Sequence, residues 1–349
     1  MKEADRLKIN QREWYNLRSV LGHDTMFTIL LGGRETGKSY AVMNFYVAQF
    51  KKHNRPFYWI RLTEASQKKL LANNSEKFVD ADIRRKYNLD LYTKGVNVYN
   101  VTQRDKEGKI KKKKLMARIL ALSTFYNDKG VGYFDNEFLN DEKMYYNICL
   151  DEMNREVGEK NSFDIAYSFI QQMENLVRST KKRVRIILIG NTLEEASDIM
   201  TCFNFLPEEW GRFKLKSKRA VVEYMEPTEA YKKRRAGTVA DLLAGDHSNF
   251  TNKIDVDKTL LYKGRLEKPM YAISFTKKDK FTVWEGLCIT EYNGEKINEI
   301  PMRPYLDKIF TTEKRDNIIE LFDTRCFCFR NLITQKKFKK CLESLRKAR

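Results

Sequence analysis

The chain has 349 residues, of which 42% are apolar and 32% are charged, so it can bury two cores and is not globally disordered. It holds 66 lysines and arginines against 47 aspartates and glutamates, and this net charge of +19 favours a polyanionic partner over the plain alternative of a soluble basic protein. No apolar run approaches the roughly 20 residues that span a bilayer, so we expect a nucleic-acid partner and no membrane.

The first 90 residues alternate between helical and strand-like patterns. Trp14, Leu17 and Val20 stand at helix spacing, which predicts a short helical lead-in over residues 1–20. After it, the apolar pattern predicts strands over 26–31 and 57–62, a helix over 38–51, and mostly helix over 64–90.

The same alternation continues to about residue 210. Residues 96–101 and 109–122 are strand-like and are joined by "RDKEGK", a hairpin signal. The pattern then predicts a strand over 145–150, an amphipathic helix over 163–180 and a strand over 183–190. Strands alternating with helices favour an α/β fold with a mainly parallel sheet and helices on both faces.

The pattern changes in the last third of the chain. Residues 213–248 are basic and contain Pro227, so we interpret them as a linker, helical around 228–236. Beyond 250, short strands with "KKDK" and "YNGEK" turns precede a basic amphipathic helix with Phe338, Leu342 and Leu345 on one side. The predicted organisation is therefore 1–212, linker 213–248, and a small β-rich domain over 249–349.

The six cysteines do not form a metal or disulfide framework. Cys326 and Cys328 are a lone C-x-C pair without a second pair at zinc spacing, and Cys149 lies in an apolar run. The N-terminus lacks the apolar core of a signal peptide. We expect a reducing, cytosolic compartment.

A phosphate-binding loop is the most specific motif. The stretch "GGRETGKS" fits G-x-x-x-x-G-K-[ST] between an apolar strand and a helix. Its glycines let backbone N–H groups surround phosphate oxygens, its lysine neutralises the outer phosphates, and its serine offers a hydroxyl to Mg²⁺. The expected nucleotide-binding residues are Gly32, Gly33, Arg34, Glu35, Thr36, Gly37, Lys38, Ser39 and Tyr40.

Two acidic residues follow a buried strand, "YYNICLDE". Asp151 at the end of this strand is placed to bind Mg²⁺ together with Ser39. Glu152 is placed to activate a water molecule, which favours hydrolysis over transfer to a substrate. The alternative is a strand that ends in two solvated acids.

Further polar residues have two interpretations each. Asn191, at the tip of "RVRIILIG", is placed to sense the γ-phosphate, although asparagine is also a common turn residue. Arg178 ends a predicted helix, where an arginine finger and a cation that offsets the helix dipole are both consistent with the position.

Two basic clusters could bind nucleic acid through phosphates without reading sequence. The first cluster, on the predicted hairpin, comprises Lys111, Lys112, Lys113 and Lys114. It would either line a pore or protect an edge strand from aggregation. The second cluster could contact DNA, RNA or a neighbouring subunit, and it comprises Lys232, Lys233, Arg234 and Arg235.

The order of these motifs resembles the DNA-packaging ATPases of small protein-primed tailed phages (Picovirinae). The likeness rests on "LGGRETGKSYA", "NICLDEMNRE", "ENLVRSTKKRVRIILIGN" and "EAYKKRRAGTVADLLAG", and it covers most of 20–245. It implies an additional-strand (ASCE) P-loop ATPase that uses ATP and Mg²⁺ and acts as a homomeric ring, which in that family looks pentameric. It also implies a host-cytoplasmic protein that docks transiently on the prohead portal and drives double-stranded DNA inward.

The resemblance also assigns roles by position. Arg178 matches the trans-acting finger, and Lys129, before the insertion "FDNEFLND", matches a second basic residue presented to the neighbouring nucleotide. The C-terminal part of the family resembles an RNase H-type nuclease without its metal-binding acids. Here Glu285 and Glu291 lie near a strand without a matching aspartate, so we expect a nuclease-dead domain for nucleic-acid or portal contact.

Two alternatives remain open at this point. One is another DNA translocase, a helicase-like ATPase or a terminase with an active nuclease. The other is a nucleotide-dependent switch or assembly factor, against which Glu152 argues because a slow switch needs no strong base. Ring size, direction of travel and the need for a structural RNA do not follow from the sequence.

Overall fold

A computed structural model describes residues 14–128, 145–155, 163–177, 183–191, 197–244, 259–302 and 312–347. The chain divides into two compact units. The first comprises Met1–Phe203 and Pro207–Ile254, and the second comprises Asn204–Leu206 and Asp255–Arg349.

The described part of the first unit is built on a nine-stranded sheet in the order β3-β4-β5-β2-β6-β7-β1-β9-β8. Its central strands pair in parallel, which confirms the mainly parallel sheet. They are β1 (Phe27–Leu31), β2 (Phe57–Arg61), β5 (Ile110–Ala121), β6 (Tyr145–Asp151), β7 (Arg183–Gly190) and β9 (Ala220–Tyr224). Antiparallel strands flank them: β3 (Leu91–Lys94), β4 (Asn97–Arg104) and β8 (Gly211–Leu215).

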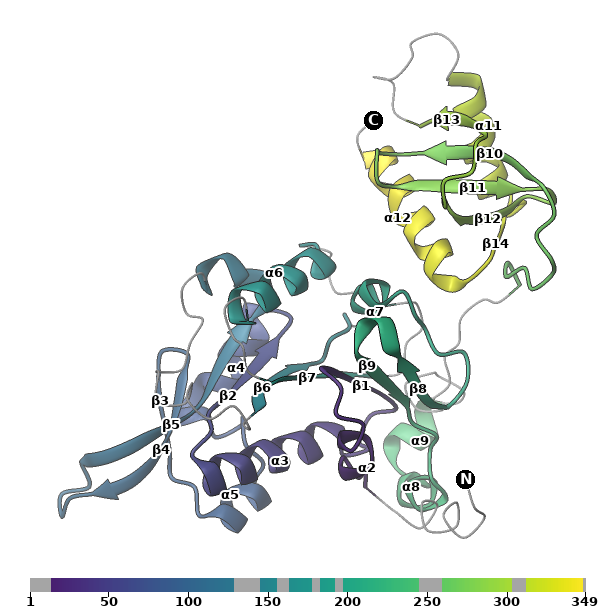
Figure 1. The fold of residues 1–349 in the computed structure, drawn as a ribbon. Coiled ribbons are helices and arrows are strands. Elements are labelled where there is room, and N and C mark those ends of the chain that lie inside the picture. Colours follow the sequence, from purple (N-terminus) through teal and green to yellow (C-terminus); the bar gives the residue numbers. More distant parts are fainter. Residues whose placement is uncertain are drawn as a thin grey trace. The chain divides into compact units, whose positions relative to one another are not determined.

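Helices cover both faces of this sheet, as the alternating pattern predicted. Figure 1 shows α2 (Arg18–Leu21), α3 (Lys38–His53) and α5 (Ala81–Tyr87) on one side, and α6 (Ile165–Val177) and α7 (Asp198–Phe203) on the other. The remaining helical elements are α4 (Glu64–Ser75), η1 (Leu122–Asp128), η3 (Lys216–Lys218), α8 (Glu229–Arg235) and α9 (Val239–Ala244). The central strands are buried on both faces, which is why stretches such as "FTILL" are continuously apolar.

The main core lies between α3 and the sheet. Val42, Tyr46 and Phe50 of α3 are buried against Trp59 of β2 and Ile187 of β7. The Tyr46 hydroxyl donates to the carbonyl of Ile148 at 2.8 Å, so its polar end is satisfied inside the core. This packing fixes the first turn of α3 at the carboxyl edge of the sheet.

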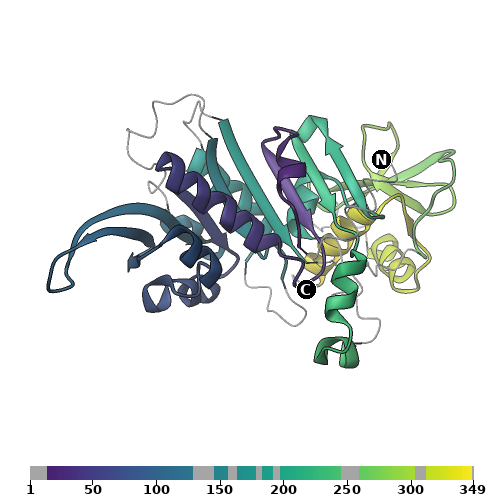
Figure 2. The same ribbon diagram turned by 90° about the horizontal axis from the view of Figure 1, so that it is seen from below.

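A two-stranded arm extends from the sheet. The outer halves of β4 and β5 project beyond the rest of the first unit in both Figures 1 and 2. Residues 111–114 of β5 are exposed, whereas 116, 117 and 119–121 are buried in the sheet. The expected hairpin is confirmed, and its basic half is the projecting half.

The prediction of a linker over 213–248 is wrong at its beginning. β8 and β9 continue the sheet next to β1, and β9 pairs in parallel with β1 from Phe27↔Ala220 to Leu31↔Tyr224. Their lysines and arginines suggested a solvated linker, but β8 is an edge strand with largely solvent-facing side chains. The helix expected around 228–236 is confirmed as α8.

The second unit has its own core. In its described residues, a five-stranded sheet in the order β13-β10-β11-β12-β14 packs with two helices. The elements are β10 (Pro269–Ser274), β11 (Lys280–Trp284), β12 (Cys288–Glu291), β13 (Asn298–Pro301), α11 (Thr312–Asp323), β14 (Cys328–Phe329) and α12 (Leu332–Lys347). Phe338 of α12 is fully buried among Phe275, Phe281 and Phe329, which confirms the amphipathic C-terminal helix.

None of the helices in the described ranges combines the length and the apolar character that a membrane crossing requires.

Candidate functional site

The candidate site lies where β1, β6 and β7 end. β7 lies between β1 and β6, so the loop after β1 and the acidic end of β6 are separated by one additional strand. The three carboxyl ends meet at one edge of the sheet because the strands are parallel, and a crevice at such an edge is the usual ligand site of open α/β sheets. The cavity there has a volume of about 670 Å³.

The loop after β1 has the shape of a phosphate cradle. Glu35 and Gly37 adopt positive φ angles of 62° and 83°, which turn the chain sharply before α3 begins at Lys38. The amino end of α3 therefore faces the cavity and favours an anion there. Any other residue at Gly37 would be strained by the positive φ angle. Its Cβ would also lie only 3.0 Å from the ring of Trp14.

Lys38 is folded into this loop. Its ammonium group donates to the carbonyls of Gly32 and Gly33 at 2.9 and 2.6 Å and to the Thr36 hydroxyl at 3.1 Å. Burial lowers the pKa of Lys38 to about 8, with Asp151 opposing the shift. The loop carbonyls thus bind the Lys38 ammonium group at the place where a bound phosphate would compete with them for it.

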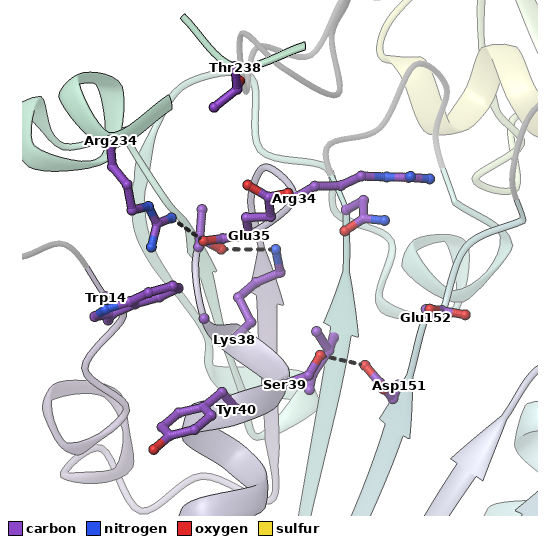
Figure 3. Close-up of a pocket in the computed structure, with 14 residues that line it drawn as sticks. Trp14, Arg34, Glu35, Lys38, Ser39, Tyr40, Asp151, Glu152, Arg234 and Thr238 are labelled. Carbon is purple, nitrogen blue, oxygen red and sulfur yellow. Dashed lines mark hydrogen bonds between the residues drawn. The ribbon is translucent and has the colours of Figure 1, made fainter. Parts of the chain in front are cut away.

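Ser39 and Asp151, the two residues expected to bind magnesium, are in direct contact. The Ser39 hydroxyl donates to Asp151 Oδ1 at 2.9 Å, across the gap between α3 and β6 (Figure 3). Burial raises the pKa of Asp151, and Arg61 and the Ser39 hydrogen bond oppose this shift. A serine hydroxyl and one carboxylate, completed by phosphate oxygens and water, fit the oxygen ligand set of Mg²⁺.

Arg61, at the end of β2, was missed by sequence reasoning. It donates to Asp151 Oδ2 at 2.8 Å and also forms an ion pair with Glu152. Glu152 has a φ of 57°, and its side chain is half exposed at the mouth of the cavity. The only signal in the sequence was a basic residue ending the strand "FYWIR", because its contact depends on β2 pairing with β6.

The helix α8 holds the phosphate loop from outside. Tyr231 donates to the carbonyl of Arg34 at 2.8 Å, and Arg234 donates to the carbonyl of Glu35 at 2.6 Å. Arg235 is buried and lies 3.5 Å from both the Arg34 carbonyl and the Glu35 carboxylate. Of the two arginines expected to bind nucleic acid or a neighbouring subunit, Arg234 therefore lines the cavity and Arg235 contacts the loop beside it.

The other expected site residues are placed as follows. Asn191 lines the cavity, as do Arg34 to Tyr40, Asp151 and Glu152. Lys232 and Lys233 are exposed on α8, and Lys111 to Lys114 are exposed on the arm of β5. Lys129 and Arg178 lie outside the described residues. The described residues contain no group of three His, Cys, Asp or Glu side chains arranged to hold a metal ion.

The strand inserted between β1 and β6, the loop after β1 and the acidic end of β6 together support an ATPase fold. The chain belongs to the family of the podovirus DNA encapsidation protein (Gp16), whose sequence model matches residues 9–323. This confirms the family that the motifs resembled.

Two curated relatives and one solved structure are similar to the chain. The DNA packaging proteins of Bacillus phages phi29 and PZA are each 24% identical to this chain over 233 residues, which is 66% of this chain and 62% of theirs. The match thus spans less than two thirds of the length of these relatives. In fold, the chain is similar to a chain of the bacteriophage phi29 viral genome packaging motor assembly, with a TM-score of 0.63 at 19% identity over 96% of this chain and 100% of that one.

Proposed function

We propose that this protein is an ATP-driven motor that translocates double-stranded viral DNA into the prohead. The observation that carries the proposal is the Ser39–Asp151 hydrogen bond beside Glu152 at the mouth of a phosphate loop, in a chain of the DNA encapsidation family. This arrangement supports hydrolysis of a nucleoside triphosphate, and the family supports DNA as the molecule that is translocated.

The residues of the cavity fit Mg-ATP. Lys38 would exchange its loop carbonyls for phosphate oxygens, and Ser39 and Asp151 would hold the ion. A bound Mg²⁺ would neutralise charge on the phosphates. Glu152 would orient the attacking water and accept its proton, for which its ion pair with Arg61 must open. Asn191 would contact the γ-phosphate from β7.

The working form in this proposal is a homomeric ring, with a pentamer as the favoured size. Arg178 and Lys129 of one subunit would reach the nucleotide of the next, so that hydrolysis in one subunit depends on its neighbour. The ring would act in the host cytoplasm and dock transiently on the phage portal, with a structural RNA as a further candidate partner. Lys111, Lys112 and Lys114 would contact DNA phosphates from the projecting arm.

The second unit would contact nucleic acid or the portal as a nuclease-like domain without activity. Glu291 is paired with Lys337 at 2.8 Å, and Glu285 is exposed in a turn, so neither converges with other acids on an ion in the described residues. The likeness to an RNase H-type nuclease belongs to this proposal. A terminase with an active nuclease and a non-translocating nucleotide switch are the competing functions.

The test is steady-state ATP hydrolysis by the purified full chain, with and without double-stranded DNA. We expect DNA to stimulate turnover and Glu152→Gln to abolish it while nucleotide binding persists. In mixtures, a small fraction of Arg178→Ala should lower wild-type turnover by more than dilution, because each subunit acts on its neighbour. Turnover that ignores DNA, with additive mixtures, would favour the nucleotide switch.

A further inference from the structure

One side of the cavity lies away from Asp151 and Glu152. Trp14, Tyr40, Arg234 and Thr238 line it together with the loop. Figure 3 shows Trp14 and Arg234 on one side of the loop, away from Asp151 and Glu152. These residues come from the lead-in before β1 and from the α8 region, about 200 residues apart in the sequence.

Trp14 and Arg234 form a stacked pair. The guanidinium carbon of Arg234 lies 3.8 Å from the centroid of the Trp14 ring. Arg234 is held there by its hydrogen bond to the Glu35 carbonyl, and Trp14 is held against Gly37 and by the neighbouring Tyr15 N–H, which donates to the Thr36 carbonyl at 2.9 Å. The pair is thus fixed to the phosphate loop from both sides.

Both members of the pair have unused binding capacity. Trp14 is 55% exposed although it is a large aromatic side chain. The Nη1 atom of Arg234 is shielded from solvent and has no hydrogen-bond partner among the described residues. A shielded donor without an acceptor is unfavourable, and an acceptor on a ligand removes that cost.

We propose that Trp14 and Arg234 form the nucleoside end of the pocket. The base stacks on the face of the Trp14 indole that Arg234 leaves free, and Arg234, on the other face, donates to an acceptor of the ribose. An exposed aromatic face held in place by a planar cation is suited to this, because every nucleobase has a π face. The inference rests on the proposed function, since it assumes that the phosphates occupy the loop around Lys38.

The test compares the binding of Mg-ATP with that of Mg-tripolyphosphate, which has the phosphates but no nucleoside. Calorimetric titrations use the full chain as wild type, Trp14→Ala, Trp14→Phe and the control Trp284→Phe, which lies in the second unit. We expect Trp14→Ala to weaken ATP about tenfold, the size of one missing base stack, and to leave tripolyphosphate within about twofold. Trp14→Phe keeps a ring and should retain most of the ATP affinity.

Three results would overturn the inference. If Trp14→Ala weakened the binding of both ligands equally, Trp14 would only support the loop at Gly37. No weakening of ATP, or wild-type protein that binds ATP no more tightly than tripolyphosphate, would mean that the base has no subsite here although the phosphate loop works. Wild-type protein that binds neither ligand would remove the phosphate site itself, and the proposed function and this inference would fail together.

Discussion

Lys38 carries its charge in a place from which water is excluded. Its pKa falls from 10.5 to about 8 on folding. Below the folded-state pKa, the charged lysine lowers the free energy of unfolding, because its proton is held less tightly in the folded than in the unfolded protein. This loss disappears as the pH rises through the folded-state and then the unfolded-state pKa. We therefore expect the wild type to gain about 3 kcal/mol relative to Lys38→Met between about pH 8 and 10.5, from 1.36 kcal/mol per pKa unit.

Urea unfolding of both proteins at pH 7 and pH 10.5 measures this change. The comparison is between pH values, so the hydrogen bonds that Lys38→Met removes from the loop carbonyls add only a constant offset. Lys52→Met, at an exposed position on the same helix, is the control for losing one lysine. A stability difference that is the same at both pH values would contradict the prediction.

How far the site could be predicted depends on how local each contact is. The phosphate loop, Asp151 and Glu152 could be predicted because a motif within eight residues or the end of one strand defines them. Arg61 and Trp14 could not, because Arg61 meets the acids only through the β2–β6 pairing and Trp14 meets Arg234 only after α8 has folded back. Arg235 was expected on a binding surface but is buried, because charge in a sequence does not reveal burial.

At the scale of elements, the arm of β4 and β5 allows a test of DNA binding that spares the fold. Lys113 packs over the rings of Tyr92 and Tyr99 at 4.4 and 4.5 Å, whereas Lys111, Lys112 and Lys114 are exposed without such a role. We expect replacement of these three by glutamine to weaken double-stranded DNA binding. The slope of log affinity against log salt should become shallower by about 0.9 for each DNA phosphate that the arm no longer neutralises.

Fluorescence anisotropy over a salt series measures that slope. The matched control replaces three exposed lysines on or just after α4 with glutamine: Lys68, Lys69 and Lys77. Stability should change by less than about 0.5 kcal/mol because the replaced side chains are in solvent. An unchanged slope would assign the lysines to protecting the open edges of the arm from aggregation.

Element boundaries show where sequence patterns suffice. Strands with continuous apolar runs, such as β1 and β7, were predicted almost to the residue because both their faces are buried. β8 was missed because an edge strand keeps its charged side chains in water and lacks that signal. The position of β9 beside β1 is a long-range pairing that no local pattern encodes.

At the scale of the whole molecule, the two compact units allow their activities to be separated. The second unit has a core of its own, centred on Phe338, so a fragment spanning 245–349 should fold alone. We expect this fragment to leave supercoiled plasmid intact in Mg²⁺ or Mn²⁺, because two-metal hydrolysis needs several converging carboxylates. Gel analysis of plasmid incubated with the folded fragment is the measurement, and metal-dependent nicking would favour the terminase alternative.

The grip of α8 on the phosphate loop also has a consequence for synthesis. The carbonyls of Arg34 and Glu35 are held by Tyr231 and Arg234, which the ribosome adds about 200 residues later. At roughly 5–20 residues per second, that interval is on the order of 10–40 s. During it the emerging chain carries the complete nucleotide motif but lacks the helix that holds its backbone and the strand β9 that covers the edge of β1. The candidate site is therefore completed only when α8 has been made, about 200 residues after its loop.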